Sequence, residues 1–312
     1  MSRRSALEWL LGLGAGRAIA RAAQPADSAT KLQVGGGVIE VSFAPDGFDL
    51  PPAALLGWVR QAARAVTAYY GRFPVPQATV RIFTGEGQGI RHGVSYGDDG
   101  VWCRITVGRG TAKAELDRDW MLTHEMVHFA FPSVERRHHW IEEGMATYVE
   151  PIARVLIGNL TAAQVWSDML RDMHQGLPEE GDEGLDNTHT WGRTYWGGAL
   201  FCLLADIAIR KNTANAKGLQ DALRAINRAG GNIETDWPLE RALQTGDKAA
   251  DGKTLMELYR KMRDAPVMVD LPGLWRQLGV ARVDGTVVFD GHAPLARARE
   301  AITAHAITAK AR

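Results

Sequence analysis

The chain has 312 residues, and 46% of them are hydrophobic, so it can bury a substantial core and is not intrinsically disordered. Its 36 basic residues balance its 36 acidic residues, and no Lys/Arg-rich run occurs, which argues against a nucleic-acid partner. Past the N-terminal segment, no stretch reaches the roughly 18 uninterrupted apolar residues that a membrane span needs. We therefore expect no membrane span in the mature chain.

The first 22 residues have the layout of an export signal. Arg3 and Arg4 precede a mildly apolar run, which is followed by small residues up to Ala22. The paired arginines resemble a twin-arginine signal, which exports folded proteins. Because Glu8 interrupts the apolar run, the alternative is an amphipathic helix on a cytoplasmic protein. The sequence thus predicts a periplasmic or secreted protein whose remaining residues, 23–312, form one domain.

The first third of this domain mixes predicted strands with one helix. The helix is expected from about Pro52 to Tyr70, with a proline at its start and Gly71 after its end. Hydrophobic alternation and turn residues predict short strands. They are expected at about 32–43, 78–83, 93–96 and 101–107, the last two forming a hairpin.

The rest of the chain is mainly helical. Helices are expected at about 117–131, 140–157, 161–174, 194–211, 215–229, 236–245 and 253–263. Pro151 can kink or split the second of them. A small hairpin is expected at 281–289 and a final helix at about 293–309. The predicted fold class is α+β, with an N-terminal lobe that holds a small sheet (about 30–135), a mainly helical C-terminal lobe (about 136–312) and a cleft between them.

The segment His124-Glu125-Met126-Val127-His128 follows the His-Glu-x-x-His pattern. On a helix, residues four apart lie one turn apart on the same face, so both imidazoles can bind one metal ion. Glu125 then lies beside the metal, where it can accept a proton from a bound water. The alternative is a pair of core histidines whose nitrogens are hydrogen-bonded to neighbouring groups.

A catalytic zinc ion needs a third protein ligand besides the two histidines. Glu143 fits, because it lies on the next predicted helix with fourteen residues between it and His128. Glu142 is the competitor, but adjacent residues on a helix diverge by about 100°, so only one of the two can face the metal. Thr147 and Glu150 share the face of Glu143, and either could orient a ligand imidazole as a hydrogen-bond acceptor.

A family resemblance rests on this motif together with Trp140-Ile141-Glu142-Glu143-Gly144-Met145-Ala146-Thr147-Tyr148. The pair resembles the gluzincin zinc metallopeptidases, especially the aminopeptidase-N and glycyl-aminopeptidase branches and their compact relatives. The resemblance implies a thermolysin-like catalytic domain, one Zn²⁺ per chain, and the glutamate before the glycine, Glu143, as the third ligand. Tyr195, in Tyr195-Trp196-Gly197-Gly198, is similar to the family's tyrosine whose hydroxyl stabilises the tetrahedral intermediate.

The resemblance also implies hydrolysis of peptide bonds in a peptide or protein substrate, with Glu125 as the general base. The family's aminopeptidases carry a Gly-x-Met-Glu-Asn segment whose glutamate binds the free amine of the substrate. The corresponding region, Gly89 to Tyr96, lacks that glutamate, so the endo or exo mode stays open. Two other hypotheses remain: a zinc hydrolase of another amide or ester, and an inactive gluzincin fold that serves as a binding module. The second is disfavoured because all five motif residues are kept.

Three other features carry weaker predictions. Cys103 and Cys202 are expected to be separately buried thiols, with a disulfide between them as the alternative. The acidic segment 179–186 is expected to be a solvated surface loop, with a calcium site as the alternative. The connector that holds His138 and His139 is expected to be an exposed turn.

Overall fold

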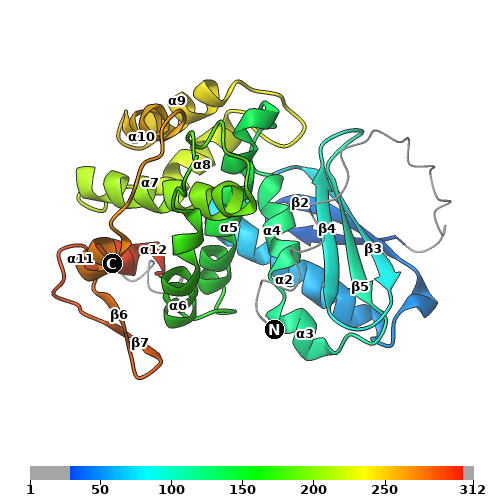
Figure 1. Ribbon diagram of the computed structural model, residues 1–312. Coiled ribbons are helices and arrows are strands. Elements are labelled where there is room, and N and C mark those ends of the chain that lie inside the picture. Colours follow the sequence, from blue (N-terminus) through cyan, green and yellow to red (C-terminus); the bar gives the residue numbers. More distant parts are fainter. Residues whose placement is uncertain (1–28, 305–312) are drawn as a thin grey trace.

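The computed structural model describes residues 29–304, so the expected export signal lies outside the described residues. A sheet and a long helix form one side of the molecule, and a group of helices forms the other (Figure 1). A single cluster of buried hydrophobic residues extends from the sheet into the helices. The mixed composition of helices and a small sheet agrees with the predicted α+β class.

Five strands form one sheet in the order β1-β2-β3-β5-β4. Their bounds are β1 (Thr30–Val34), β2 (Gly37–Phe43), β3 (Gln77–Gly85), β4 (Ile90–Tyr96) and β5 (Trp102–Gly108). The three central strands run parallel, whereas β1 and β4 pair antiparallel with their neighbours. Strand β4 is therefore an edge strand, and Figure 1 shows it on the side of the sheet nearest to α4.

Helix α2 (Pro52–Tyr70) has the predicted bounds. A proline lies in its first turn, and Gly71 ends it in the left-handed region at φ 80°, which glycine adopts without steric cost. The helix links the parallel strands β2 and β3, and it packs on β1, α4 and α5. It thus joins the sheet to the two helices of the predicted metal site.

Ten further helices follow along the chain within the described residues. They are α3 (Lys113–Arg118), α4 (Met121–His128), α5 (His139–Leu156), α6 (Ala162–Asp172), α7 (Gly198–Asn212), α8 (Leu219–Arg228), α9 (Leu239–Ala249), α10 (Thr254–Met262), α11 (Leu271–Leu278) and α12 (Ala296–Ile302). The predicted C-terminal hairpin is confirmed as β6 (Val280–Val283) and β7 (Thr286–Phe289). Among the described residues, the structure has no helix with the length and apolarity required to cross a bilayer.

The single helix predicted at 117–131 is wrong, because the chain forms two short helices there, α3 and α4. Asp119 separates them in an extended conformation, and its carboxylate accepts hydrogen bonds from the backbone N–H groups of Met121 and Leu122, both at 3.0 Å. These are two of the donors that a helix start leaves without partners. Asp119 therefore fixes where the helix with the His-Glu-x-x-His motif begins.

Helices α5 and α7 touch through glycines. A Cβ atom built on Gly144 would lie 2.2 Å from Cα of Gly198, and one built on Gly198 would lie 2.1 Å from the carbonyl oxygen of Trp140. Such distances are far below van der Waals contact, so only glycine allows this crossing. Pro151 does not split α5, which runs on to Leu156.

Both cysteines are buried and free, as expected. Cys103 lies in the central strand β5, and Cys202 lies in α7. The disulfide alternative is therefore wrong for this structure.

Candidate metal centre and cleft

Helix α4 presents His124 and His128 on one face, one turn apart. His124 is 5% exposed and Glu125 is 7% exposed, so the polar groups of the motif lie in a largely apolar environment. A buried charge or imidazole in such a place needs a partner. The partner comes from the next helix in the chain, α5.

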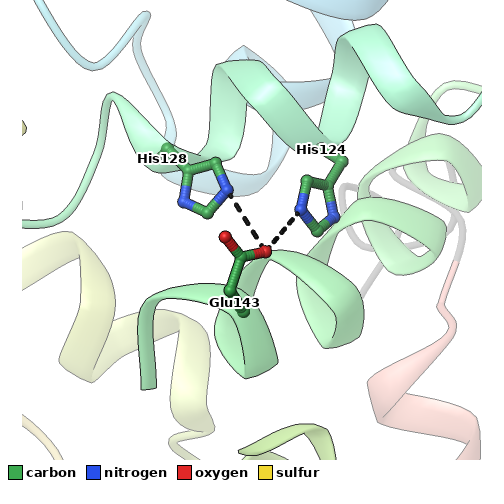
Figure 2. A group of neighbouring side chains, drawn as sticks. All are labelled: His124, His128 and Glu143. Carbon is green, nitrogen blue, oxygen red and sulfur yellow. Dashed lines mark hydrogen bonds and ion pairs between the residues drawn. The ribbon is translucent and has the colours of Figure 1, made fainter. Parts of the chain in front are cut away.

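The structure brings together His124, His128 and Glu143. The Nε2 atom of His124 lies 3.1 Å from Oε2 of Glu143, and Nε2 of His128 lies 3.8 Å from the same oxygen (Figure 2). One donor atom from each residue lies within 4.8 Å of the other two. Two imidazole nitrogens and one carboxylate oxygen form the ligand set of many catalytic zinc sites, and the spacing leaves room for an ion between them.

Glu142, the competing ligand candidate, points elsewhere. Its Oε1 accepts a hydrogen bond from the backbone N–H of Val134 at 3.3 Å, and its Oε2 lies 3.0 Å from Nδ1 of His139. The divergence of adjacent side chains on a helix therefore leaves Glu143 as the residue of this pair that faces the two histidines.

At His128 and Glu143 the electrostatics favour the protonation states that metal binding requires, whereas the pKa of His124 is raised, because the lowering effect of burial is outweighed by Glu143. Burial lowers the pKa of His128 to about 4, against the opposing effect of Glu143, so this imidazole is neutral at pH 7. Burial alone would raise the pKa of Glu143, but His128 and His124 lower it to about 2. A neutral imidazole and an ionised carboxylate are the forms that bind a divalent cation.

Glu125 lies under strand β4. The hydroxyl of Ser95 lies 2.7 Å from Oε2 of Glu125 and 2.8 Å from its carbonyl oxygen, and its one proton can be donated to either acceptor. A Cβ atom on Gly93 would lie 2.9 Å from Cγ of Glu125, so the strand approaches the carboxylate closely because residue 93 is glycine. The sequence did not single out Ser95, since a lone serine in a strand carries no signal.

Burial raises the pKa of Glu125 to about 7, although His124 and the Ser95 hydroxyl act in the opposite direction. A carboxylate whose pKa lies near neutral pH can both accept and return a proton. This is the property that a general base in hydrolysis needs.

Tyr195 lies in a π-helical segment, Gly192–Gly197 (η4), that leads directly into α7. Its ring stacks at 6.4 Å from that of His124 and at 5.9 Å from that of Trp191. Burial, together with the charges of Glu143 and Glu125, raises the pKa of Tyr195, so its hydroxyl stays protonated at neutral pH. π-Helical segments are rare and occur frequently at functional sites.

A cavity of about 650 Å³ opens over these groups. Strand β4 forms one wall of the cavity. The lining of the cavity also includes His189, Trp191 and Tyr195. Segment 231–237 packs against the chain where β4 ends, since a Cβ on Gly97 would lie 2.0 Å from the carbonyl oxygen of Ile233. Three of its residues line the cavity: Ile233, Glu234 and Asp236. The cavity thus joins the metal group to an edge strand.

Ser133 holds segment 231–237 in place. Its backbone N–H donates to Thr235 and its carbonyl accepts from Trp237, at 2.9 and 3.0 Å. Its hydroxyl donates to the carbonyl oxygen of Ile233 at 3.1 Å. These bonds connect the cavity wall to the segment that follows α4.

Thr147 and Glu150 both border a small cavity next to His124. Glu150 is buried, its Oε1 accepts from Arg154 at 2.8 Å, and its charge is one of those that raise the pKa of His124. Their hydrogen bonding to a ligand imidazole stays a prediction.

The expectations of an exposed connector and a solvated acidic loop hold only in part: His139 is exposed as expected, but His138 and two of the acids are not. His138 is 1% exposed rather than exposed, because its Nδ1 lies 2.9 Å from Asp186 inside the protein. Asp186 also accepts from Trp140 and Tyr259, and Asp182 forms an ion pair with Arg193 at 2.6 Å. These two acids of the 179–186 segment thus point inward, whereas three others are solvent-exposed: Glu179, Glu180 and Glu183.

Comparison with known proteins places this geometry in a known fold. Neither a family model nor a curated protein matches the sequence. Solved structures do match: an aminopeptidase N family protein from Idiomarina loihiensis aligns with a TM-score of 0.60 over 86% of this chain, at 12% identity. A variant of a two-domain M1 zinc metallopeptidase bound to L-arginine aligns at 0.51 over 78%, at 16% identity. A variant of an M1 zinc metallopeptidase from Deinococcus radiodurans aligns at 0.50 over 78%, at 14% identity.

The chain has a fold like that of M1 zinc metallopeptidases. This confirms the predicted gluzincin-like architecture at the level of the fold. The chain spans about half the length of the solved proteins that it matches, with 53%, 52% and 53% of those chains covered. Fold alone does not assign chemistry, which has to come from the site itself.

Proposed function

We propose that the protein is a zinc-dependent metallopeptidase that hydrolyses peptide bonds, with His124, His128 and Glu143 as the ligands of one Zn²⁺. The observation that carries the proposal is the convergence of their three donor atoms within 4.8 Å of one another, in the cavity that Glu125 also lines. The M1-like fold supports the choice of zinc and of a peptide or protein substrate.

The bound zinc ion would lower the pKa of a water and polarise the carbonyl of the substrate. Glu125 accepts the proton of the attacking water and later passes it to the leaving amine. Ser95 holds the Glu125 carboxylate by a hydrogen bond at 2.7 Å. The Tyr195 hydroxyl, which stays protonated, donates a hydrogen bond to the oxyanion of the tetrahedral intermediate.

Strand β4 supports a peptide as the substrate. It is an edge strand that lines the cavity beside Glu125, so its outer edge can pair with an extended chain. Pairing along β4 would present the scissile bond to the metal group. Segment 231–237, which lines the cavity beyond the end of β4, would limit the length of substrate there.

The first test is elemental analysis of the purified protein beside a His128→Ala variant, with turnover of a quenched peptide library measured on both. We expect about one zinc per chain in the wild type, and loss of both metal and turnover in the variant. Zinc without turnover would favour another amide or ester substrate, or an inactive binding module. An absence of stoichiometric metal in the wild type would contradict the proposal.

We further propose that the protein acts in the periplasm or outside the cell. This rests on the basic, apolar and small-residue order of residues 1–22. Expression of the full chain in a bacterium, followed by N-terminal sequencing of the protein from each compartment, tests it. An uncleaved cytoplasmic protein would favour the alternative location.

A further inference from the structure

His139 is a third histidine at the metal group, beside His124 and His128, and neither the motif nor the proposed mechanism uses it. It is the first residue of α5, three residues before Glu142 and four before Glu143. Residues at these spacings are neighbours on a helix surface. Its side chain is 51% exposed and lines the cavity, in contrast to the buried His138 that precedes it.

The imidazole of His139 bridges the two carboxylates of its helix. Its Nδ1 lies 3.0 Å from Oε2 of Glu142, and its Nε2 lies 3.3 Å from Oε1 of Glu143. Glu142 is itself tied to the connector by the N–H of Val134. A continuous series of contacts therefore leads from the connector through Glu142 and His139 to the proposed zinc ligand.

The two oxygens of Glu143 have different neighbours. Oε2 faces the Nε2 atoms of His124 and His128, and both dashed lines in Figure 2 reach this single oxygen. Oε1 faces His139. A carboxylate held in this way offers one oxygen to an ion and keeps the other engaged with a side chain of its own helix.

We propose that His139 is a positioning residue for the metal site: it binds Oε1 of Glu143, so that Glu143 coordinates the metal through Oε2 alone. Coordination by one oxygen leaves a position for water on a four-coordinate ion, which catalysis requires. Outer hydrogen-bond partners of metal ligands commonly contribute 10- to 100-fold to metal affinity (roughly). Glu142, which does not face the metal group, takes part by anchoring His139.

The experiment measures zinc affinity by competition with a chelator, on the full chain and on three variants. His139→Ala removes the contact, His139→Gln keeps an N–H donor of similar reach, and His292→Ala is the matched control. His292 is exposed in the connection between β7 and α12. Thermal melting of each variant without metal checks that the fold is kept.

We expect His139→Ala to weaken zinc binding by about 10-fold or more, His139→Gln to restore most of the loss, and His292→Ala to match the wild type. A zinc-loaded crystal structure of His139→Ala should show both oxygens of Glu143 at the metal. Peptide turnover at saturating zinc should fall in kcat rather than rise in KM.

Equal zinc affinity in wild type and His139→Ala would overturn the positioning role. An increase in KM with unchanged zinc affinity would also overturn it and would make His139 a substrate contact. The inference rests on the proposed function, but the two fail differently. A wild-type protein that binds no zinc refutes both the proposed function and the role of His139. Tight zinc binding that is unchanged in His139→Ala refutes only the role of His139.

Discussion

The two walls of the cavity are built in different ways. The wall with the metal group comes from α4 and α5, which are consecutive in the chain, and its donor residues lie within a span of twenty residues, 124–143. The opposite wall comes from β4, the η4 segment with Tyr195, and segment 231–237, which are far apart in sequence. The first wall depends on helix periodicity, and the second depends on how distant segments pack.

This difference explains which residues can be exchanged. In the metal wall, each residue acts through its own donor atom. In the opposite wall, several residues act by being small or by holding a neighbour, such as Gly93 against Glu125 and Gly97 against Ile233. Substitutions in the metal wall should therefore affect chemistry most, and substitutions at the supporting positions should affect geometry and stability.

The largest effect is expected for Glu125→Gln, which removes the proton acceptor and keeps the shape of the side chain. We expect turnover to fall by about 10²- to 10⁴-fold, while zinc content measured by elemental analysis stays at the wild-type level. Glu135→Gln, at an exposed acid of the connector, is the control. A Glu125→Gln variant with wild-type turnover would contradict the assigned role.

Gly144→Ala should disturb both walls together. The added Cβ would lie 2.2 Å from Gly198, so α5 and α7 must separate, and we expect a loss of about 1–3 kcal/mol in the free energy of unfolding. The displacement should also weaken zinc binding through Glu143.

The matched control is Gly57→Ala in α2, where the added Cβ has no neighbour within 4 Å. There we expect a gain of up to about 1 kcal/mol from helix propensity. Chemical denaturation of both variants measures the contrast, and a Gly144→Ala protein as stable as Gly57→Ala would mean that the helices can move apart freely.

Ser95→Ala tests the support that β4 gives to the general base. Loss of a hydrogen bond to a charged group costs about 1.5–3 kcal/mol, so we expect kcat to fall by roughly tenfold or more, with zinc content unchanged. Ser42→Ala in β2, a serine of the same sheet that does not line the cavity, should leave kcat near the wild-type value. Equal kcat values for the two variants would contradict the role of Ser95 in supporting Glu125.

The smallest effect is expected at Asp119, before the start of α4. Burial raises the pKa of Asp119 from its ordinary value of 3.8 to about 6, so the folded state binds this proton more tightly than the unfolded state. Its contribution to stability is therefore complete below pH 4 and is lost as the pH rises from about 4 to about 6. For this partly buried group we expect a change on the order of 2 kcal/mol or less.

Denaturation of metal-free wild type and Asp119→Asn at pH 4 and pH 6.5 measures this change. The wild type should lose stability relative to Asp119→Asn over this interval. A difference between the two proteins that does not vary with pH would show that Asp119 ionises with an ordinary pKa.

Much of the fold was predictable, because its signals are local. Pro52 marks the start of α2 and Gly71 its end, and the turn around Asp284 indicates the last hairpin. The division between α3 and α4 was not predicted, because nothing in the sequence distinguishes Asp119 from other polar residues. Only the structure shows that its carboxylate accepts hydrogen bonds from two backbone N–H groups at the start of α4. Helix α11 was also missed, although Asp270 caps it and Gly279 ends it.

For the site, the sequence predicted the residues that the structure brings together, His124, His128 and Glu143. It did not predict the supporting contacts. Ser95 reaches Glu125 only because the sheet places its edge strand over α4, and Asp186 reaches His138 from a loop 48 residues away. Contacts of this kind depend on tertiary packing and leave no pattern in the neighbouring residues.

The glycine crossing of α5 and α7 has a consequence for how the site can move. Glu143 precedes one of the two touching glycines, and Tyr195 lies three residues before the other. Backbone in direct contact has no side chain that can change rotamer to absorb a shift. The carboxylate ligand and the phenolic hydroxyl thus share one rigid backbone contact, and we expect the cleft to open through the other two parts of its lining, β4 and segment 231–237.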